Sequence, residues 1–193
     1  MIARMRRISK FVIPMMFLGI LVVALPAMGA QDAVLTNIIV TNTRDDLLLY
    51  LTVKNAFSPE IEDTIQRGVP ATFSFYLNLY RVRQFWPDKA ITTVEVHHTL
   101  KFDILRKEYT VTRSWDGNAP MTFKTLEEAE RRMAELDSLP IVSLDRLERG
   151  KRYQIRAKAK LDKLTLPFKL HYVLFFVSLW DFETDWYTID FIY

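Results

Sequence analysis

The chain has 193 residues, of which half are hydrophobic, 26 are basic, 23 are acidic and none is cysteine. Such an apolar composition argues against disorder, and a chain without cysteine has no disulfide bond, thiol nucleophile or zinc–thiolate cluster. Residues 1–30 hold four basic residues and no acidic residue, which leaves 22 basic and 23 acidic residues in residues 31–193. The resulting net charge of −1 excludes a polycation, so we expect no nucleic-acid partner.

The N-terminus predicts export. Arg4, Arg6, Arg7 and Lys10 precede an uncharged apolar stretch, Phe11–Leu25, which mostly small residues follow up to Ala30. This order is typical of a secretory signal peptide, and the stretch is shorter than the ~20 residues of a spanning helix. We predict that residues 1–30 are a signal peptide or, alternatively, an uncleaved N-terminal anchor. Residues 31–193 are predicted to form a single β-rich domain in the periplasm.

The first half of this domain predicts a hairpin, a helix and two long strands. Val34–Val40 and Leu47–Val53 are the expected hairpin, with the second strand central in its sheet. Ser58 as N-cap, Pro59 at the first position and Gly68 as stop indicate a short helix. Strands are expected over Thr72–Phe85 and Ile91–Ile104, with Ile104 facing the core. The alternation then changes parity, which predicts a bulge or tight turn near Leu105–Lys107.

The second half predicts one more helix and three strands. Thr125 and Glu128 form a capping box, and Leu126, Ala129, Met133 and Leu136 form the buried stripe, with Pro140 just past the helix. Strands are expected over Tyr153–Leu161, Phe168–Trp180 and Trp186–Tyr193. The fold class is therefore mainly β. We predict an antiparallel β-sandwich, Ig-like or a curved sheet, with two short helices over open ends or edges.

Several segments, in this order, resemble the DUF4390 family of bacterial exported proteins. They are FSPEIEDTIQRGVPATFSF (57–75), LYRVRQFW (79–86), LKFDILRKEYTV (100–111), FKTLEEA (123–129), LDKLTLPFKL (161–170) and SLWDFETDWY (178–187). The resemblance implies a secreted or periplasmic domain of unknown function and brings no catalytic residues. Because some relatives are encoded beside a membrane histidine kinase, it also implies a link to a membrane sensor.

Two groups of basic residues are the candidate partner surface. Arg152, Arg156, Lys158 and Lys160 share the outward face of one expected strand, with Arg149, Lys151 and Lys163 nearby. Such a row can bind anionic lipid head groups or an acidic partner, or it protects a solvated or edge strand by charge. The second group is Arg81, Arg83 and Trp86 with Phe85, either a partner contact or the anchor at the end of a strand.

Carboxylates and histidines offer weaker alternatives. Asp181, Glu183 and Asp185 lie between two tryptophans, where carboxylates could hydrolyse glycosides or bind Ca²⁺, or simply form an acidic turn. His97 and His98 are neighbours on a strand and point to opposite faces, so we interpret His98 as a hydrogen-bonded core histidine. A site that joins His97 to His171 would need their two strands to meet. The five scattered glycines contain no dinucleotide or phosphate-loop fingerprint, so we expect neither cofactor nor metal.

The sequence favours an exported, non-enzymatic binding or accessory module of the bacterial envelope. We expect an envelope protein as partner, and membrane contact only through the N-terminal segment if it stays uncleaved. The alternatives are an integral outer-membrane β protein, whose strands also alternate, and an envelope hydrolase that uses the C-terminal carboxylates.

Overall fold

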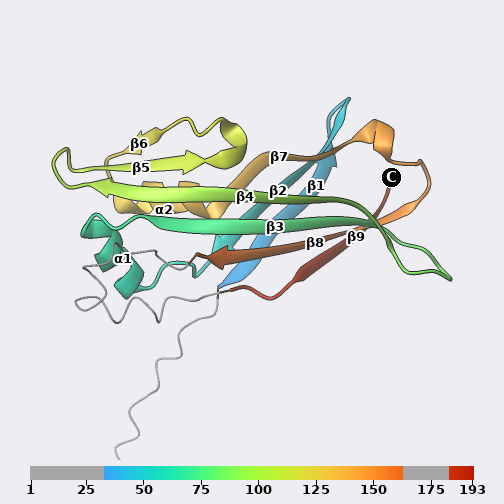
Figure 1. Cartoon of the computed structure of the whole chain (residues 1–193), viewed down its shortest axis with the longest axis horizontal. Helices are drawn as coiled ribbons and strands as arrows, with labels where there is room; N and C mark the ends of the chain where they lie inside the picture. The colour runs from blue at the N-terminus through green and yellow to red at the C-terminus, as the bar shows by residue number, and fades with distance from the viewer. Residues whose placement is uncertain (1–32, 163–182) are drawn as a thin grey trace, which may run out of the picture.

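The computed structural model describes residues 33–162 and 183–193. In this part of the chain, strands form two antiparallel sheets, drawn in Figure 1. The three-stranded sheet has the order β1-β2-β7, and the six-stranded sheet has the order β6-β5-β4-β3-β8-β9. The predicted leader (1–30), Lys163, the strand expected over 168–180 and His171 lie outside the described residues.

The smaller sheet consists of β1 (Val34–Asn42), β2 (Asp46–Lys54) and β7 (Glu135–Ser143). β1 and β2 form the predicted hairpin, and β2 is central as expected. Every second residue of β2 is buried, from Leu47 to Val53. This face therefore belongs to the core.

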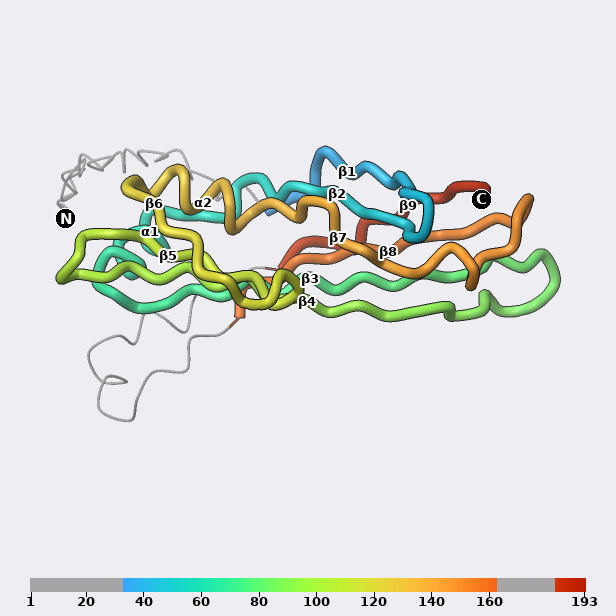
Figure 2. The backbone as a smooth tube through the Cα atoms, turned by 90° about the horizontal axis from the view of Figure 1, so that it is seen from above, coloured from blue at the N-terminus to red at the C-terminus, as the bar shows by residue number. Residues whose placement is uncertain are grey.

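The larger sheet contains β3 (Ala71–Arg81), β4 (Lys89–Asp103), β5 (Glu108–Arg113), β6 (Met121–Phe123), β8 (Arg152–Leu161) and β9 (Tyr187–Ile192). Its inner face buries alternating side chains, among them Phe73 and Phe75 on β3 and Tyr153 and Ile155 on β8. Figure 2 shows β1 and β2 on one side of the molecule and β3 and β4 on the other. One hydrophobic cluster joins the buried residues of both sheets, so the predicted β-sandwich is confirmed.

Both predicted helices are present with their caps. In α1 (Pro59–Gln66), the Ser58 hydroxyl accepts a hydrogen bond from the Ile61 amide at 3.4 Å. In α2 (Leu126–Ala134), the Thr125 hydroxyl accepts one from the Glu128 amide at 3.3 Å. α2 packs on β4, β5 and β6 of the larger sheet and also contacts β2 of the smaller sheet. Among the described residues, no helix is long and apolar enough to cross a membrane.

Three boundaries differ from the predictions. The strand expected to reach Phe85 ends at Arg81, and residues beyond it form the turn of the β3–β4 hairpin. Ile104 does not face the core: it is 58% exposed in the predicted tight turn, where the Asp103 carboxylate accepts amide hydrogen bonds from Leu105 and Arg106. The second helix ends at Ala134, so Leu136 is buried in β7 instead of in the helix stripe.

Candidate interaction surface

The basic row on β8 is an interior feature of the sheet. β8 pairs with β3 on one side and with β9 on the other, so it is not the edge strand that charge would protect. Register then places acidic residues of the C-terminal segment beside the row, because Gln154 pairs with Asp190 and Lys160 bridges to Glu183.

Each cation of this row has an acidic neighbour. Arg152 lies 3.4 Å from the Asp190 carboxylate, Arg156 lies 3.7 Å from Asp88, and Lys160 lies 3.6 Å from Glu183. Lys158 pairs with Glu183 as well and lies 5.3 Å from the centre of the Trp186 ring. Three carboxylates therefore offset most of the charge of these four cations within the molecule, which weakens the interpretation of the row as a free docking surface.

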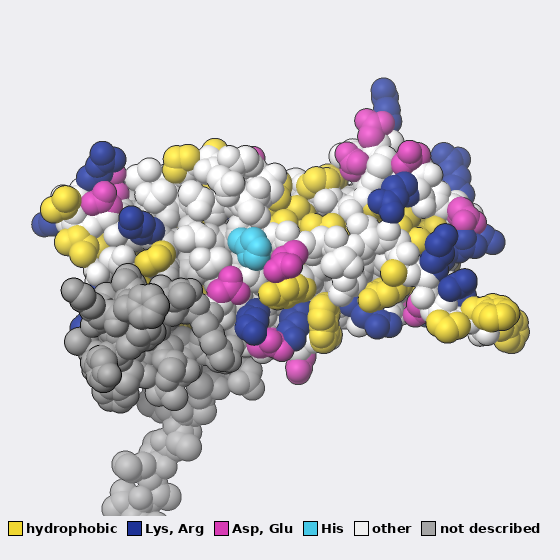
Figure 3. All heavy atoms as spheres, in the orientation of Figure 1, with side chains coloured by type: hydrophobic (Ala, Val, Ile, Leu, Met, Phe, Trp, Pro, Cys, Tyr) yellow, Lys and Arg dark blue, Asp and Glu magenta, His cyan; other side chains and the backbone are white. Residues whose placement is uncertain are grey.

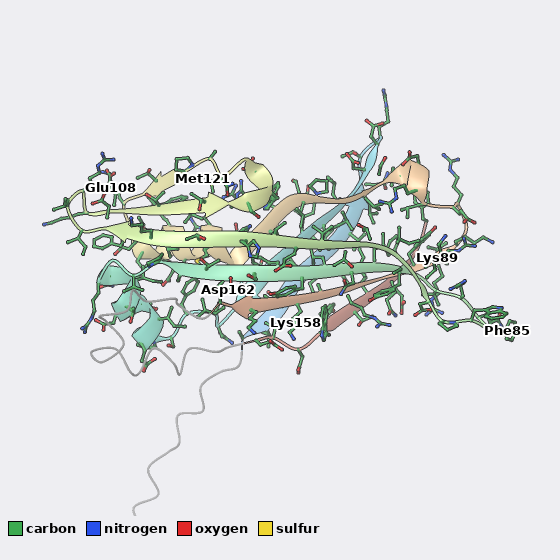
Figure 4. The ribbon with its side chains drawn as sticks, in the orientation of Figure 1. Phe85, Lys89, Glu108, Met121, Lys158 and Asp162 are labelled. Atoms are coloured by element: carbon green, nitrogen blue, oxygen red, sulfur yellow. The ribbon has the colours of Figure 1, made fainter. Side chains whose placement is uncertain are left out.

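The second predicted group lies at the turn of the β3–β4 hairpin, where Figure 4 shows Phe85 projecting from the end of the molecule. Phe85 is 86% exposed and Trp86 is 72% exposed. Arg83 closes the turn: its Nε donates to the Pro87 carbonyl at 2.9 Å. Arg81 belongs to the base of the hairpin and pairs with Glu148. The structure thus places Arg83 and Trp86 together at the tip and Arg81 behind them.

Further basic residues surround this tip. The Val82 amide donates to the Arg152 carbonyl at 2.9 Å, which joins the hairpin to the start of β8. Arg149 and Lys151 are exposed in the turn just before β8, and Lys89 is exposed at the first position of β4. Figure 3 shows basic side chains gathered around the hydrophobic tip at this end. We call Arg83, Phe85, Trp86, Lys89, Arg149 and Lys151 the basic–aromatic end.

Ion pairing distinguishes this end from the β8 row. Within the described residues, no carboxylate lies at ion-pair distance from Arg83, Lys89, Arg149 or Lys151. Uncompensated cations beside exposed aromatic rings are typical of surfaces that contact something else.

The outward face of the larger sheet, seen in Figure 3, is largely free of hydrophobic patches near its middle, and it carries a shallow hollow. The hollow measures about 320 Å³ and is lined by Asn78, Tyr80, Arg156, Trp186 and Thr188. The Arg156 guanidinium lies 4.8 Å from the centre of the Tyr80 ring. Because cations cover both Tyr80 and Trp186, these rings are occupied within the fold.

The C-terminal carboxylates line a larger hollow of about 570 Å³ beside the start of β1. Glu183 and Asp185 both contribute to its wall, whereas Asp181 lies outside the described residues. The hydrogen bond from Lys158 lowers the pKa of Glu183, which keeps the carboxyl ionised. Since Lys158 and Lys160 engage both Glu183 oxygens, this side chain is poorly suited to donate a proton to a glycoside.

His98 is the core histidine that the alternation predicts. Its Nδ1 donates to the Met133 carbonyl at 2.9 Å, and its Nε2 accepts from the Trp115 indole at 3.1 Å. Burial lowers the pKa of His98 to about 4, so the ring is neutral. With both nitrogens occupied, His98 has no free position for a metal. Among the described residues, no group of three or more His, Asp or Glu is arranged to hold one.

Sequence reasoning missed a hydrogen-bonded chain across three strands. The Ser74 hydroxyl donates to the Asp162 carboxylate at 2.7 Å and lies 2.8 Å from His97 Nδ1. Because the carboxylate only accepts, Nδ1–H of His97 is the donor to Ser74. In a hydrolytic triad, histidine lies between serine and acid. Here the serine lies between them and is buried, so these hydrogen bonds link β3, β4 and the end of β8. The β3–β4 register pairs Ser74 with His97, and no local sequence pattern indicates this pairing.

Comparison with known families agrees with the quoted sequence segments. The model of a domain of unknown function, DUF4390, matches residues 30–190. The chain belongs to the DUF4390 family. No curated protein and no solved structure matches it. The family description assigns no activity, so the function of this DUF4390 protein has to be inferred from its own surface.

Proposed function

We propose that this DUF4390 protein is an exported, non-enzymatic binding module of the bacterial envelope, and that it binds through the basic–aromatic end. The observation that carries the proposal is the exposure of Phe85 and Trp86 at the hairpin tip. Two adjacent aromatic side chains that are both exposed to solvent are typical of a surface that binds a partner. A signal-peptide-like N-terminus supports export.

Two observations favour binding over hydrolysis. The Ser74–His97–Asp162 chain has the wrong order for a nucleophile, and Glu183 is held ionised by lysines. In contrast, no described carboxylate lies at ion-pair distance from Arg83, Lys89, Arg149 or Lys151, which leaves the charge of these side chains available to a partner.

Two single-cysteine variants test export and binding together, because the natural chain has no cysteine. Gln84→Cys places a thiol at the hairpin tip. Leu105→Cys places one in the β4–β5 turn at the opposite end of β4, where Leu105 is 95% exposed. Cells with a permeabilised outer membrane are treated with a maleimide that cannot cross the inner membrane, and labelling rates are compared with those of the purified variants.

We expect Leu105→Cys to react in unlysed cells as fast as in the purified protein. Gln84→Cys should react several-fold more slowly in cells, because whatever the tip contacts covers it. Reaction of Leu105→Cys only after lysis would show that the domain is not exported. If Gln84→Cys also reacts in cells as fast as in the purified protein, the basic–aromatic end is uncovered in the cell. The proposed binding role would then be wrong.

A further inference from the structure

We infer that the basic–aromatic end docks on an anionic membrane surface, with Phe85 and Trp86 in the interfacial layer and the surrounding cations against lipid phosphates. This inference rests on the proposed binding role and names its partner. It adds a membrane contact outside the N-terminal segment.

The apolar part of the contact is a rigid apex. The Arg83 side chain donates a hydrogen bond to the Pro87 carbonyl, and the Arg83 amide donates one to the Asp88 carboxylate at 3.4 Å. These bonds close the turn, so Phe85 and Trp86 are the outermost side chains of the hairpin, as Figure 4 shows for Phe85. Aromatic residues are favoured at the depth of lipid head groups, where an apolar ring meets both tails and water.

The electrostatic part is a set of cations behind this apex. Lys89 lies at the base of the same hairpin, and Arg149 and Lys151 lie in the turn that Val82 joins through Arg152. The neighbouring cations Arg81 and Arg152 are paired with Glu148 and Asp190. Lys89, Arg149 and Lys151 have no such ion pair, and each is free to approach a negative leaflet, which attracts Lys and Arg individually.

The shape of this end favours a membrane over a protein. A stable protein interface buries roughly 800 Å² on each partner across matched surfaces. A hairpin apex with two rings is narrow and projects from the body (Figure 4). A fluid head-group layer accommodates such a projection without a complementary shape, and long flexible cations reach its phosphates at many positions.

The test uses the full chain with the Gln84→Cys or Leu105→Cys substitution, each carrying a polarity-sensitive dye. The two proteins are mixed with vesicles of equal parts phosphatidylglycerol and phosphatidylcholine, or of phosphatidylcholine alone. We expect the dye at position 84 to enter a less polar environment with the anionic vesicles, and the dye at position 105 to remain in water. Because the signal is local, insertion of an uncleaved leader would not imitate it.

Matched variants separate the two parts of the contact. Phe85→Ser with Trp86→Ser should reduce vesicle binding at least about tenfold, because the interfacial rings are lost. Ile104→Ser with Leu105→Ser removes two exposed apolar side chains elsewhere and should have little effect.

Lys89→Gln with Lys151→Gln should weaken vesicle binding several-fold and reduce its salt dependence. Lys54→Gln with Lys101→Gln changes the net charge equally and should have neither effect. Lys101 is about 40 Å along β4 from Lys89.

Equal binding to both vesicle types, or an aqueous environment for position 84 on anionic vesicles, would overturn the inference. If position 84 nevertheless remains protected in cells, the binding role stands and its partner is a protein. Circular dichroism of each variant verifies folding, and the single-cysteine pair gives an answer even if one double variant fails to fold.

Discussion

Glu130 of α2 is a carboxyl that the fold holds in an unfavourable place. Burial raises its pKa to about 7, and the nearby charges of Glu62 on α1 and Glu127 on α2 act in the same direction. Its Oε1 is buried, and no donor among the described residues reaches it. Burial raises the pKa of Tyr109 on β5, and the nearby charge of Glu130 raises this pKa further. Ionising Glu130 therefore costs the folded state free energy.

Replacing Glu130 with Gln should stabilise the protein at alkaline pH. Between pH 4.5 and about 7 the folded state keeps a proton that the unfolded chain has lost, so stability declines as pH rises through this window. At pH 8 we expect the free energy of unfolding of the variant to exceed that of the natural protein by about 1–2 kcal/mol. This range is reduced because Glu130 is partly exposed. At pH 4 the two should be equal.

Urea unfolding at a series of pH values measures this difference. His98 contributes the opposite slope, because its lowered pKa makes protonation favour the unfolded chain below its ordinary value of 6.5. The difference between the two proteins removes that contribution. A constant difference at all pH values would contradict the assignment.

At this scale, strand alternation predicted the face that most side chains occupy, although not that of Ile104, and it did not predict which residue each side chain meets. The buried position of His98 follows from strand alternation. Its bonds to Trp115 and Met133 depend on how the β5 side of the sheet and α2 pack, which no local pattern encodes. The same holds for Lys158: the basic row was visible in the sequence, but its partner Glu183 is 25 residues away.

Among the elements, β7 shows most clearly why a local pattern can mislead. Leu136 continues the periodicity of α2, and Pro140 resembles a stop signal after a helix. In the structure, Ser138 has a φ of +58°, and the β2–β7 register shifts at two places. These irregularities disrupt the alternation of a strand. β7 lies at the edge of its sheet, where proline is tolerated because its missing N–H can face away from the ladder.

α1 ends in a position that only glycine fits well. Gly68 has a φ of +86°, and a Cβ added there would lie 3.0 Å from Ile104 Cδ1. Ile104 was predicted to face the core, and its actual role is to cover the end of this helix from the β4–β5 turn. The exposed turn and the helix terminus are therefore packed on each other.

Gly68→Ala should destabilise the protein by about 1–2 kcal/mol, since the left-handed conformation and the contact with Ile104 both oppose a methyl group. Gly117→Ala is the matched control, because Gly117 also has a positive φ but has open space around it. We expect a smaller loss there, of about 1 kcal/mol. Adding Ile104→Ala to Gly68→Ala should reduce the extra cost of the contact. Equal losses at both glycines would contradict the proposed contact.

For the whole molecule, the important feature is that neither sheet has a core of its own. Leu49 of β2 and Phe75 of β3 are both fully buried in one cluster. The pairings that build the sheets connect distant parts of the sequence, such as Asp46 with Ser143 and Phe73 with Leu161. Composition and alternation were sufficient to predict a sandwich. Strand order was not predictable, because it depends on these long-range pairings.

A shared core predicts that the sheets unfold together. Leu49→Ala and Phe75→Ala should each lower stability by about 2–5 kcal/mol, because each leaves a cavity in the same cluster. We expect one cooperative transition for both variants, with far-UV circular dichroism and tryptophan fluorescence changing at the same urea concentration. Two separated transitions in either variant would show that the sheets are independent.

The pairing of β8 with β9 also sets an order of events for a chain that is exported as we propose. β8 acquires its second neighbour only after residues 187–192 have emerged, and Lys158 meets Glu183 at about the same stage. Before that moment β8 lacks its β9 neighbour, and the larger sheet is incomplete. In an exported chain, the described sheet is therefore completed only after residues 187–192 have crossed the membrane.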